Sequence, residues 1–231
     1  FGLGLDIPGP VGLVSQSGAL RTLVQGLAAG TKLGFSVLVS IGNKAAVDEV
    51  DLVQVLHTDE NTKVIAGYLE DVGRGQEFMK VTERVSKDKP VVILKSGRTL
   101  AGAKAASSHT GSLAGADVAY ACAFERTGVI RADSLEHLFD VSAALAYQPL
   151  PRGDRVAVVT NAGGPGIMMS DALELIGLHM AEIDEETKGT LTEQLPPAAS
   201  VGNPVDVLGD AGSELYGTAV GTLLACECVD S

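Results

Sequence analysis

His109 lies in a stretch of small residues that suits a nucleophilic side chain. Residues 107–112 read SSHTGS, and Gly, Ala and Ser dominate the sequence after Lys95. These residue types favour an exposed loop. Neutral imidazole is nucleophilic at physiological pH, and a carboxylate can orient its second nitrogen. His109 can therefore accept a transferable group, although a solvated loop histidine is the simpler interpretation of this residue by itself.

Glu70 is the candidate partner of that histidine. It ends the run KVIAGYLE at 63–70, which predicts a strand. The loops of a parallel sheet gather at the carboxyl ends of its strands, so a carboxylate placed there can meet His109. A solvent-facing acid is the alternative for Glu70 taken alone.

Two turns, each between a predicted strand and a predicted helix, have the composition of phosphate-binding sites. Small residues there let an anion reach free backbone N–H groups, and the helix dipole favours negative charge. The alternatives are an ordinary helix N-cap for the first turn and a ligand-free tight turn for the second. A serine-hydrolase elbow is excluded because G-x-S-x-G fails around both serines of the first turn. The two turns are Ser15-Gln16-Ser17-Gly18 and Asn161-Ala162-Gly163-Gly164-Pro165-Gly166.

The charge balance restricts the class of partner. With 29 acidic and 17 basic residues, the formal net charge is -12. Long-range repulsion of phosphates argues against a broad nucleic-acid or anionic-membrane surface. No apolar run approaches the roughly 20 residues that cross a bilayer, and the N-terminus lacks the order of a signal peptide. We therefore expect a cytoplasmic protein.

The cysteine and histidine content predicts neither a disulfide framework nor a structural metal site. The chain has 3 cysteines and 4 histidines, without the spacing of a zinc site. Cys122 is expected to be a buried, small apolar residue, and Cys226-Glu227-Cys228 is given no metal role.

Short β-branched runs alternate with helix-length segments, as in a parallel sheet with helical crossovers. The runs lie at 11–15, 35–41, 63–70 and 90–96, followed by a short strand after Gly128. Apolar periodicity predicts helices at 47–58, 115–126 and 134–147. Gly128 is the expected C-cap of the second of these helices. The fold class is thus α/β.

A domain boundary is predicted at 148–154, where two prolines and a glycine disfavour both helix and strand. The first domain then spans 1–148 and the second 149–231. A strand at 155–160, a glycine-rich turn and a helix from Pro165 to Ile176 begin the second domain. Its remaining elements do not complete a sheet, so we expect this domain to be truncated.

Five motifs in order resemble the ADP-forming acetyl-CoA synthetases, also called NDP-forming acyl-CoA synthetases, which are relatives of succinyl-CoA synthetase. The similarity covers nearly the whole chain, and the set is specific although each motif alone is weak. The motifs are VGLVSQSGAL, SIGNKAAVDEVDLV, GRTLAGAKAASSHTGSLAGAD, VVTNAGGPGIMMSDALE and PPAASVGNPVDVLGDA.

The resemblance implies a fold and a set of roles. Both domains would be flavodoxin-like and of the succinyl-CoA synthetase type. His109 matches the histidine that carries the phosphoryl group, and Glu70 matches the carboxylate that orients it. The two turns, 15–18 and 161–166, match two facing phosphate-binding helix starts. Asn43 is implied, more weakly, to line the acyl or phosphate site.

The resemblance also implies a reaction and partners. Acyl-CoA, ADP and phosphate would give the carboxylic acid, CoA and ATP, through an acyl phosphate and a phosphohistidine. CoA, ADP or ATP with Mg²⁺, and inorganic phosphate would take part, and an oligomer is expected. The CoA-binding and ATP-grasp regions of the family are missing from these 231 residues, which we interpret as a fragment. The alternative is a regulatory module fused to a protein acetyltransferase, in which the histidine is expected to be absent.

Overall fold

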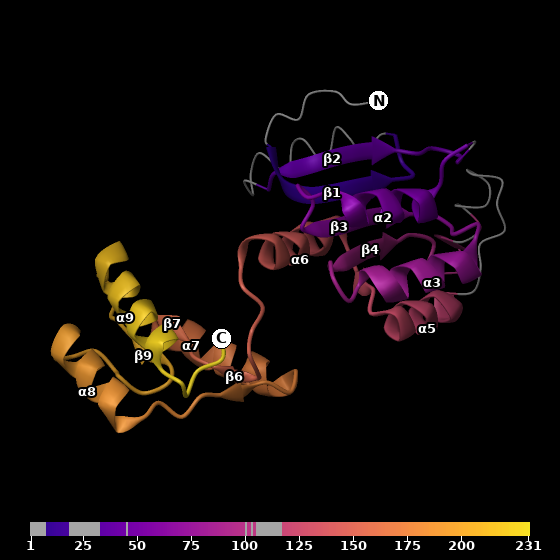
Figure 1. The fold of residues 1–231 in the computed structure, drawn as a ribbon. Helices are drawn as coiled ribbons and strands as arrows, with labels where there is room; N and C mark the ends of the chain where they lie inside the picture. The colour runs from indigo at the N-terminus through magenta and orange to yellow at the C-terminus, as the bar shows by residue number, and fades with distance from the viewer. Residues whose placement is uncertain (1–7, 19–32, 45, 100, 103, 105–116) are drawn as a thin grey trace. The chain divides into compact units, whose positions relative to one another are not determined.

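The computed structural model describes residues 8–18, 33–44, 46–99, 101–102, 104 and 117–231 (Figure 1). The chain forms two compact units, Phe1–Pro149 and Leu150–Ser231. The division falls inside the segment rich in proline and glycine at 148–154. In the described part of the chain, no helix is both long enough and apolar enough to cross a membrane.

The first unit is built on a five-stranded parallel sheet, which confirms the α/β class. Its strand order is β2-β1-β3-β4-β5, so the chain begins near the middle of the sheet and reaches both edges. The apolar runs in the sequence become these strands because their side chains are buried on both faces. The strands are β1 (Pro8–Ser15), β2 (Phe35–Ser40), β3 (Val64–Leu69), β4 (Val91–Lys95) and β5 (Ile130–Ala132).

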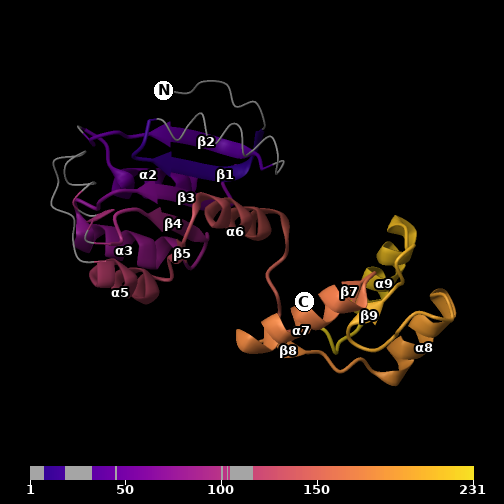
Figure 2. The ribbon, with the colours of Figure 1, turned by 180° about the vertical axis from the view of Figure 1, so that it is seen from behind.

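Helices cover both faces of this sheet (Figures 1 and 2). On one face, α2 (Glu49–Thr58), α3 (Gly75–Val85) and α5 (Asp117–Thr127) share a core with the strands. On the other face, α6 (Leu135–Tyr147) packs against β1, β3, β4 and β5. Gly128 follows α5 with a φ of +70°, which confirms its predicted C-cap role.

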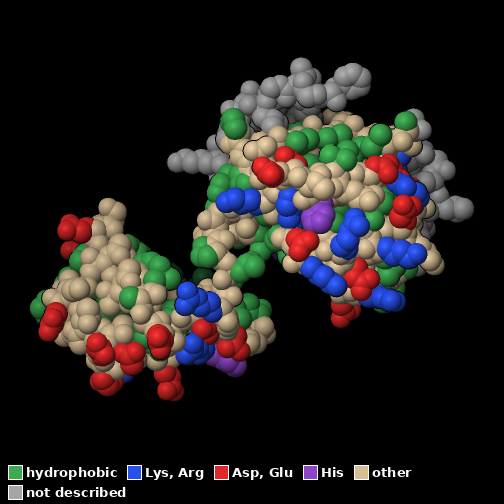
Figure 3. Space-filling view, in the orientation of Figure 1, with side chains coloured by type: hydrophobic (Ala, Val, Ile, Leu, Met, Phe, Trp, Pro, Cys, Tyr) green, Lys and Arg blue, Asp and Glu red, His purple; other side chains and the backbone are tan. Residues whose placement is uncertain are grey.

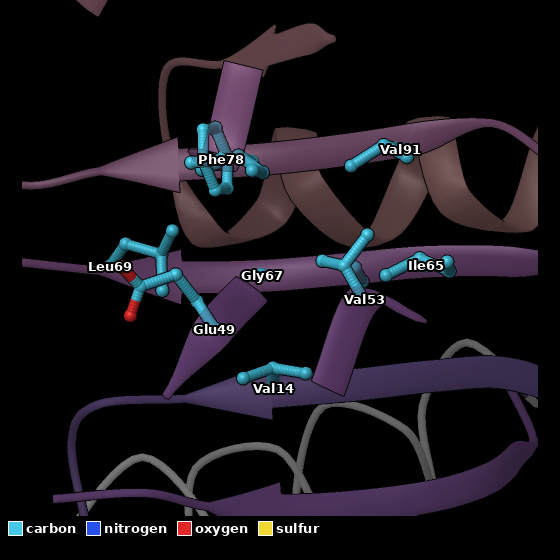
Figure 4. A pocket seen from close by; sticks show the side chains of 10 residues that line it. Val14, Glu49, Val53, Ile65, Gly67, Leu69, Phe78 and Val91 are labelled. Atoms are coloured by element: carbon cyan, nitrogen blue, oxygen red, sulfur yellow. The ribbon is translucent and has the colours of Figure 1, made fainter. Parts of the chain in front are cut away.

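A cavity between the sheet and one layer of helices is too small for a substrate. The cavity between the sheet and helices α2 and α3 has a volume of about 10 Å³ (Figure 4). It is lined by apolar side chains such as Val14, Val53 and Phe78, with Glu49 at one end. One water needs roughly 10–15 Å³ and several polar partners. This cavity is therefore not a candidate for a substrate site.

The second unit differs from the predicted single strand at 155–160. The segment forms two short strands, β6 (Arg155–Val156) and β7 (Val159–Thr160), which pair in parallel with β8 (His179–Met180) and β9 (Val205–Asp206). The side chain of Asn203 separates them, because its Oδ1 accepts from Val158 N at 2.9 Å and its Nδ2 donates to Val156 O at 2.8 Å. Three helices complete the unit: α7 (Gly163–Leu175), α8 (Glu185–Gln194) and α9 (Ser213–Ala225).

Two expectations about cysteine were wrong. Cys226 and Cys228 are joined by a disulfide across a single residue, a local link that no spacing rule for frameworks describes. Cys122 is exposed rather than buried. The inward face of α5 is formed by Phe124 and Thr127, and Cys122 falls outside this stripe because of the helical period.

Local hydrogen bonds fix the N-terminus of α2. Asp48 caps the helix by accepting from Val50 N and Asp51 N, and Asp51 returns the bond to Asp48 N. Hydrogen bonds from Arg74 hold the pKa of Asp48 below the ordinary value of an aspartate. Because the folded pKa is depressed, this stabilisation is present above about pH 4 and is lost as the pH falls through the folded pKa.

We expect Asp48→Ala to lower the free energy of unfolding by about 1 kcal/mol at neutral pH, because a capping oxygen is removed. Asp48→Asn keeps the cap and should lose less. Urea denaturation measures both. The control is Asp140→Ala, at an exposed position of α6, which should change stability by less than about 0.5 kcal/mol. Equal losses in Asp48→Ala and Asp140→Ala would contradict the capping role.

Candidate functional site

The carboxyl ends of β1, β3 and β4 meet at one edge of the first sheet. At this edge the side chain of Gln16 accepts hydrogen bonds from the backbone N–H groups that follow β3. Its Oε1 accepts from the N–H groups of Glu70 at 2.6 Å and Asp71 at 3.1 Å. Its Nε2 donates to Asp71 Oδ1 at 2.5 Å. Gln16 is buried, so these bonds form away from bulk water. The turn after β1 and the end of β3 are therefore held together through one amide.

Lys44 joins the turn after β2 to the same edge. Its Nζ lies 2.8 Å from Asp71 Oδ1, 2.8 Å from Asp71 O and 3.0 Å from Glu49 Oε2. Figure 4 shows the Glu49 carboxylate at the end toward which the strand arrows point. Glu49 Oε1 accepts from Gly73 N at 3.3 Å. Lys44 has a φ of +57°, an uncommon value for a non-glycine residue that aims its side chain across the edge.

Glu70 is buried, contrary to the solvent-facing alternative, with 8% of its surface exposed. Its Oε2 has no hydrogen-bond partner among the described residues. Buried polar atoms in native proteins nearly always have a partner, and leaving a charged one without a bond costs more than leaving a neutral one. The Glu70 carboxylate is thus prepared to accept a hydrogen bond from a group outside the described residues.

Lys95 brings a second buried ammonium group to this edge. It ends β4, it is 1% exposed, and its Nζ donates to Ser96 O at 2.5 Å and lies 4.5 Å from the centroid of the Tyr120 ring. Burial lowers the pKa of Lys95, and the charges of Asp117, Asp71 and Glu70 oppose that shift. The edge therefore combines carboxylates with two held cations.

The same turn closes β1 and β7. In the first unit Ser15 Oγ donates to Ser17 O at 2.9 Å and accepts from Ser17 N at 3.1 Å. In the second unit Thr160 Oγ1 donates to Ala162 O at 2.8 Å and accepts from Ala162 N at 3.1 Å. The hydroxyl at each strand end thus fixes the chain before the next helix. The two candidate phosphate turns share this local design.

The N-terminus of α7 is open to a ligand. Its N-cap residue, Ala162, supplies no side-chain hydrogen bond, and no acid lies in the first turn. A Cβ placed on Gly164 would meet nothing within 4 Å, and one on Gly163 would meet only Asp206 Oδ2 at 3.9 Å. Gly166 also allows close packing, since a Cβ there would lie 3.0 Å from Thr160 Cγ2. Free N–H groups and the helix dipole make such a terminus suitable for an anion.

The structure places the predicted residues unevenly. Ser15, Gln16 and Glu70 lie together at the first edge, whereas the turn at 161–166 belongs to the second unit. Asn43 is exposed in the turn after β2. His109 lies outside the described residues. Ser17 and Gly18 follow Gln16 in the first turn, before the point where the described segment ends.

Sequence reasoning missed Lys44, Asp71 and Lys95. A lysine at the end of the apolar run PVVILK was the available signal for Lys95, because lysine is rarely buried without a reason. Nothing in the sequence showed that Lys44 reaches Asp71. Among the described groups, Glu70 can orient an imidazole. The ammonium groups of Lys44 and Lys95 can balance the negative charge of an anion bound at this edge.

Two family models match the chain. The succinyl-CoA ligase-like flavodoxin domain matches residues 8–145, and the ligase-CoA domain matches residues 156–227. Each match falls within one of the two units of the structure.

Similar proteins of named activity come from archaea. The alpha subunit of ADP-forming acetate–CoA ligase I from Pyrococcus furiosus is 46% identical over 219 residues, which are 95% of this chain and 47% of the relative. The ADP-forming 4-hydroxybutyrate–CoA ligase of Nitrosopumilus maritimus is 46% identical over 205 residues, 88% of this chain and 29% of the relative. The chain thus spans about half, or less, of the length of these relatives.

A solved structure agrees with the fold. The acetyl-coenzyme A synthetase 1 of Candidatus Korarchaeum cryptofilum, described as dinucleotide forming and in complex with phosphate and ADP, matches with a TM-score of 0.88 and 40% identity. The match covers 97% of this chain and 49% of that one.

The role of the Gln16 amide can be tested by replacing it with a carboxylate. In Gln16→Glu, the new carboxylate cannot donate to Asp71 and repels it, so we expect a loss of about 1–3 kcal/mol at about pH 7.5. Repulsion raises the folded pKa of the carboxyl pair above the unfolded value of about 4.3, so the loss should shrink as the pH falls toward 5. Urea denaturation at the two pH values measures the difference.

The matched control is Gln76→Glu at an exposed position of α3. It should change stability by less than about 0.5 kcal/mol at either pH. A loss in Gln16→Glu that does not depend on pH would contradict the assigned contact with Asp71.

Proposed function

Because the chain belongs to the succinyl-CoA ligase-like flavodoxin family, we propose that it is the phosphohistidine-bearing part of an NDP-forming acyl-CoA ligase. The chain covers only part of its relatives' length, so the complete reaction requires regions beyond these 231 residues. The proposed equation converts acyl-CoA, ADP and phosphate to a carboxylic acid, CoA and ATP.

The proposed reaction has three balanced steps. Phosphate oxygen attacks the thioester carbonyl, the C–S bond breaks, and CoA leaves as the thiol with acyl phosphate as the product. An imidazole nitrogen of His109 then attacks phosphorus, the bond between phosphorus and the acyl oxygen breaks, and the carboxylate leaves. Finally ADP oxygen attacks the phosphohistidine, the P–N bond breaks, and ATP forms. Every step transfers an acyl or phosphoryl group, so no oxidant or reductant is needed.

The observation that carries this proposal is the buried carboxylate of Glu70. Its unpartnered Oε2 needs a hydrogen-bond donor, and an imidazole N–H is a donor of the required kind. A carboxylate that accepts from one ring nitrogen fixes the tautomer, so the other nitrogen keeps its lone pair for attack. It also stabilises the positive charge that develops on the ring when phosphorus is bound. Glu70 thus acts as the orienting group and His109 as the nucleophile.

Each of the two small-residue turns would bind phosphate oxygens in its own unit. The uncapped start of α7, with Asn161 before it and Gly163, Gly164 and Pro165 in its first turn, offers N–H groups and has no acid within that turn, although the carboxylate of Asp206 lies close to Gly163. Preorganised N–H donors at a helix start stabilise charge on a transferring group without reorganisation. Ser15 to Gly18 would serve in the same way in the first unit, and the exposed Asn43 would contact the acid or phosphate.

The names of the relatives guide the proposal on substrates and partners. They act on acetate and on 4-hydroxybutyrate, so we infer a small carboxylic acid or its CoA thioester as the substrate class. One relative is an alpha subunit, which supports a further subunit or further domains that bind CoA and Mg²⁺-nucleotide. We also propose the cytoplasm as the place of action.

The experiment that tests the function is phosphorylation of the complete ligase. With radiolabelled ATP, we expect one acid-labile, base-stable phosphate per chain, because a phosphohistidine has this chemical signature. His109→Ala should abolish the label. His137→Ala, at an exposed histidine of α6, is the matched control and should leave it unchanged. Label that persists in His109→Ala would refute the central assignment.

The role of Glu70 is tested in the same assay. Glu70→Gln should slow phosphorylation on the order of 100-fold while the fold is retained, because orientation and charge stabilisation are lost together. Rapid quench measurement of the labelled fraction gives the rate. Glu60→Gln changes an exposed acid after α2 and should keep the parent's rate. Equal rates for Glu70→Gln and Glu60→Gln would remove Glu70 from the mechanism.

A further inference from the structure

Three side chains from distant parts of the second unit converge beside α8. Cys226 is the C-cap residue of α9, Cys228 follows two residues later, and Asp184 is the N-cap residue of α8. Their ligand atoms all lie within 4.8 Å of one another. Cys226 Sγ is 3.1 Å from Asp184 Oδ2. The proposed ligase reaction uses none of these residues.

We propose that Asp184, Cys226 and Cys228, with both cysteines reduced, bind a thiophilic divalent cation of the zinc class. Thiolates and carboxylates are established zinc ligands, and three protein ligands leave a fourth position for water. The sequence alone gave this cysteine pair no metal role, because the third ligand lies 42 residues away.

The turn after α9 already directs both cysteines to one side. Their Cα atoms are 5.2 Å apart, and Cys228 N lies 3.2 Å from Cys226 Sγ, within reach for an N–H···S bond. Arg155 Nη2 donates to the carbonyl of the intervening Glu227 at 3.0 Å, which fixes the turn. Two zinc-bound sulfurs are about 3.8 Å apart when the Zn–S bonds are about 2.3 Å and the angle is tetrahedral. Zinc therefore requires the two sulfur atoms, which are bonded to each other in the structure, to move apart after reduction.

Asp184 is oriented as a metal ligand should be. Its Oδ1 accepts from Thr187 N at 2.7 Å, which closes the first turn of α8. This bond points the other oxygen, Oδ2, toward Cys226. Ligands that are fixed by a second hydrogen bond bind metals more tightly than mobile ones.

The negative charge of the proposed ligands favours binding of a cation. Two thiolates and one carboxylate bring three negative charges together, and the acids Glu186 and Glu227 line the same groove. Acidic side chains gather over the α8 part of this unit in Figure 3. The C-terminus of α9 favours a cation at Cys226, whereas the N-terminus of α8 opposes one. The anionic ligands decide the balance, because their full charges exceed the partial charge of one helix end.

The ion and the disulfide exclude each other. The Cys226–Cys228 bond must first be reduced by an added phosphine, which takes oxygen from water and leaves as its oxide, while the two hydrogens of that water go to the two thiols. Binding then releases protons, because each thiol that joins the metal gives up its hydrogen. The oxidised chain consequently serves as a built-in comparison with the same sequence and the same fold.

Titration of the phosphine-reduced 231-residue chain with Co²⁺, followed by displacement with Zn²⁺, tests the site. We expect one equivalent of Co²⁺ to bind with thiolate-to-cobalt charge-transfer absorption, and Zn²⁺ to abolish that absorption. Cys226→Ser and Cys228→Ser should each weaken Zn²⁺ binding by about 100-fold or more, because loss of a supporting group alone costs about 10–100-fold. Chelator competition measures the affinity.

Two matched variants separate the site from general effects. Asp184→Asn keeps a good N-cap for α8 but removes the charge, and it should weaken binding by roughly tenfold or more. Cys122→Ser removes the exposed cysteine of the first unit and should bind like the parent. Circular dichroism checks that each variant is folded.

Several results would overturn the proposal. These are uptake of less than one equivalent by the reduced parent, equal binding by reduced and oxidised chains, or parent-like affinity in Cys226→Ser or Asp184→Asn. Loss of binding in Cys122→Ser would place the metal elsewhere. The readout does not depend on ligase activity, so failure here leaves the proposed function untouched.

Discussion

The bonding of Gln16 to the end of β3 is the contact on which the first site depends. Parallel strands that end in register leave N–H groups without a neighbouring strand, and these groups need partners when they are buried. The Gln16 amide accepts from two of them and donates to Asp71, so one side chain sets the course of the chain after β1 and after β3. Glu70 is buried at this edge because its own N–H is among the bound groups.

Acidic and basic side chains at the same edge offset one another's charge as a group rather than in separate pairs. Lys44 contacts Asp71 and Glu49, and the buried Lys95 lies within electrostatic range of Glu70. This arrangement lowers the electrostatic cost of burying carboxylates at this edge, because nearby cations offset part of their desolvation. It also provides positive charge close to where phosphate chemistry is proposed, in a protein whose net charge is -12.

The second unit contains the same hydroxyl-bonded turn as the first unit, but different residues hold the strand that precedes it. The hydroxyls of Ser15 and Thr160 make the same pair of bonds two residues ahead. The strand pairing around Thr160 is short, and Asn203 supplies bonds that a longer strand would have made, including one to Ala181 O at 3.0 Å. The same turn can thus follow strands of different sheets, because its hydroxyl hydrogen bonds involve only the residue that ends the strand and the residue two positions later.

The sequence by itself determined the α/β class, the strands of the first sheet, the helix boundaries near Gly128 and Ser134, and the family, because buried strands and caps leave local patterns. It also named Gln16 and Glu70. Tertiary structure alone decided that Glu70 is buried with an oxygen that has no partner among the described residues, that Lys44 reaches Asp71, and that β6 and β7 are separate strands. Tertiary structure likewise brought Asp184 to Cys226 and Cys228. Each of these depends on side chains distant in sequence meeting in space, and no local pattern of residue types encodes such a meeting.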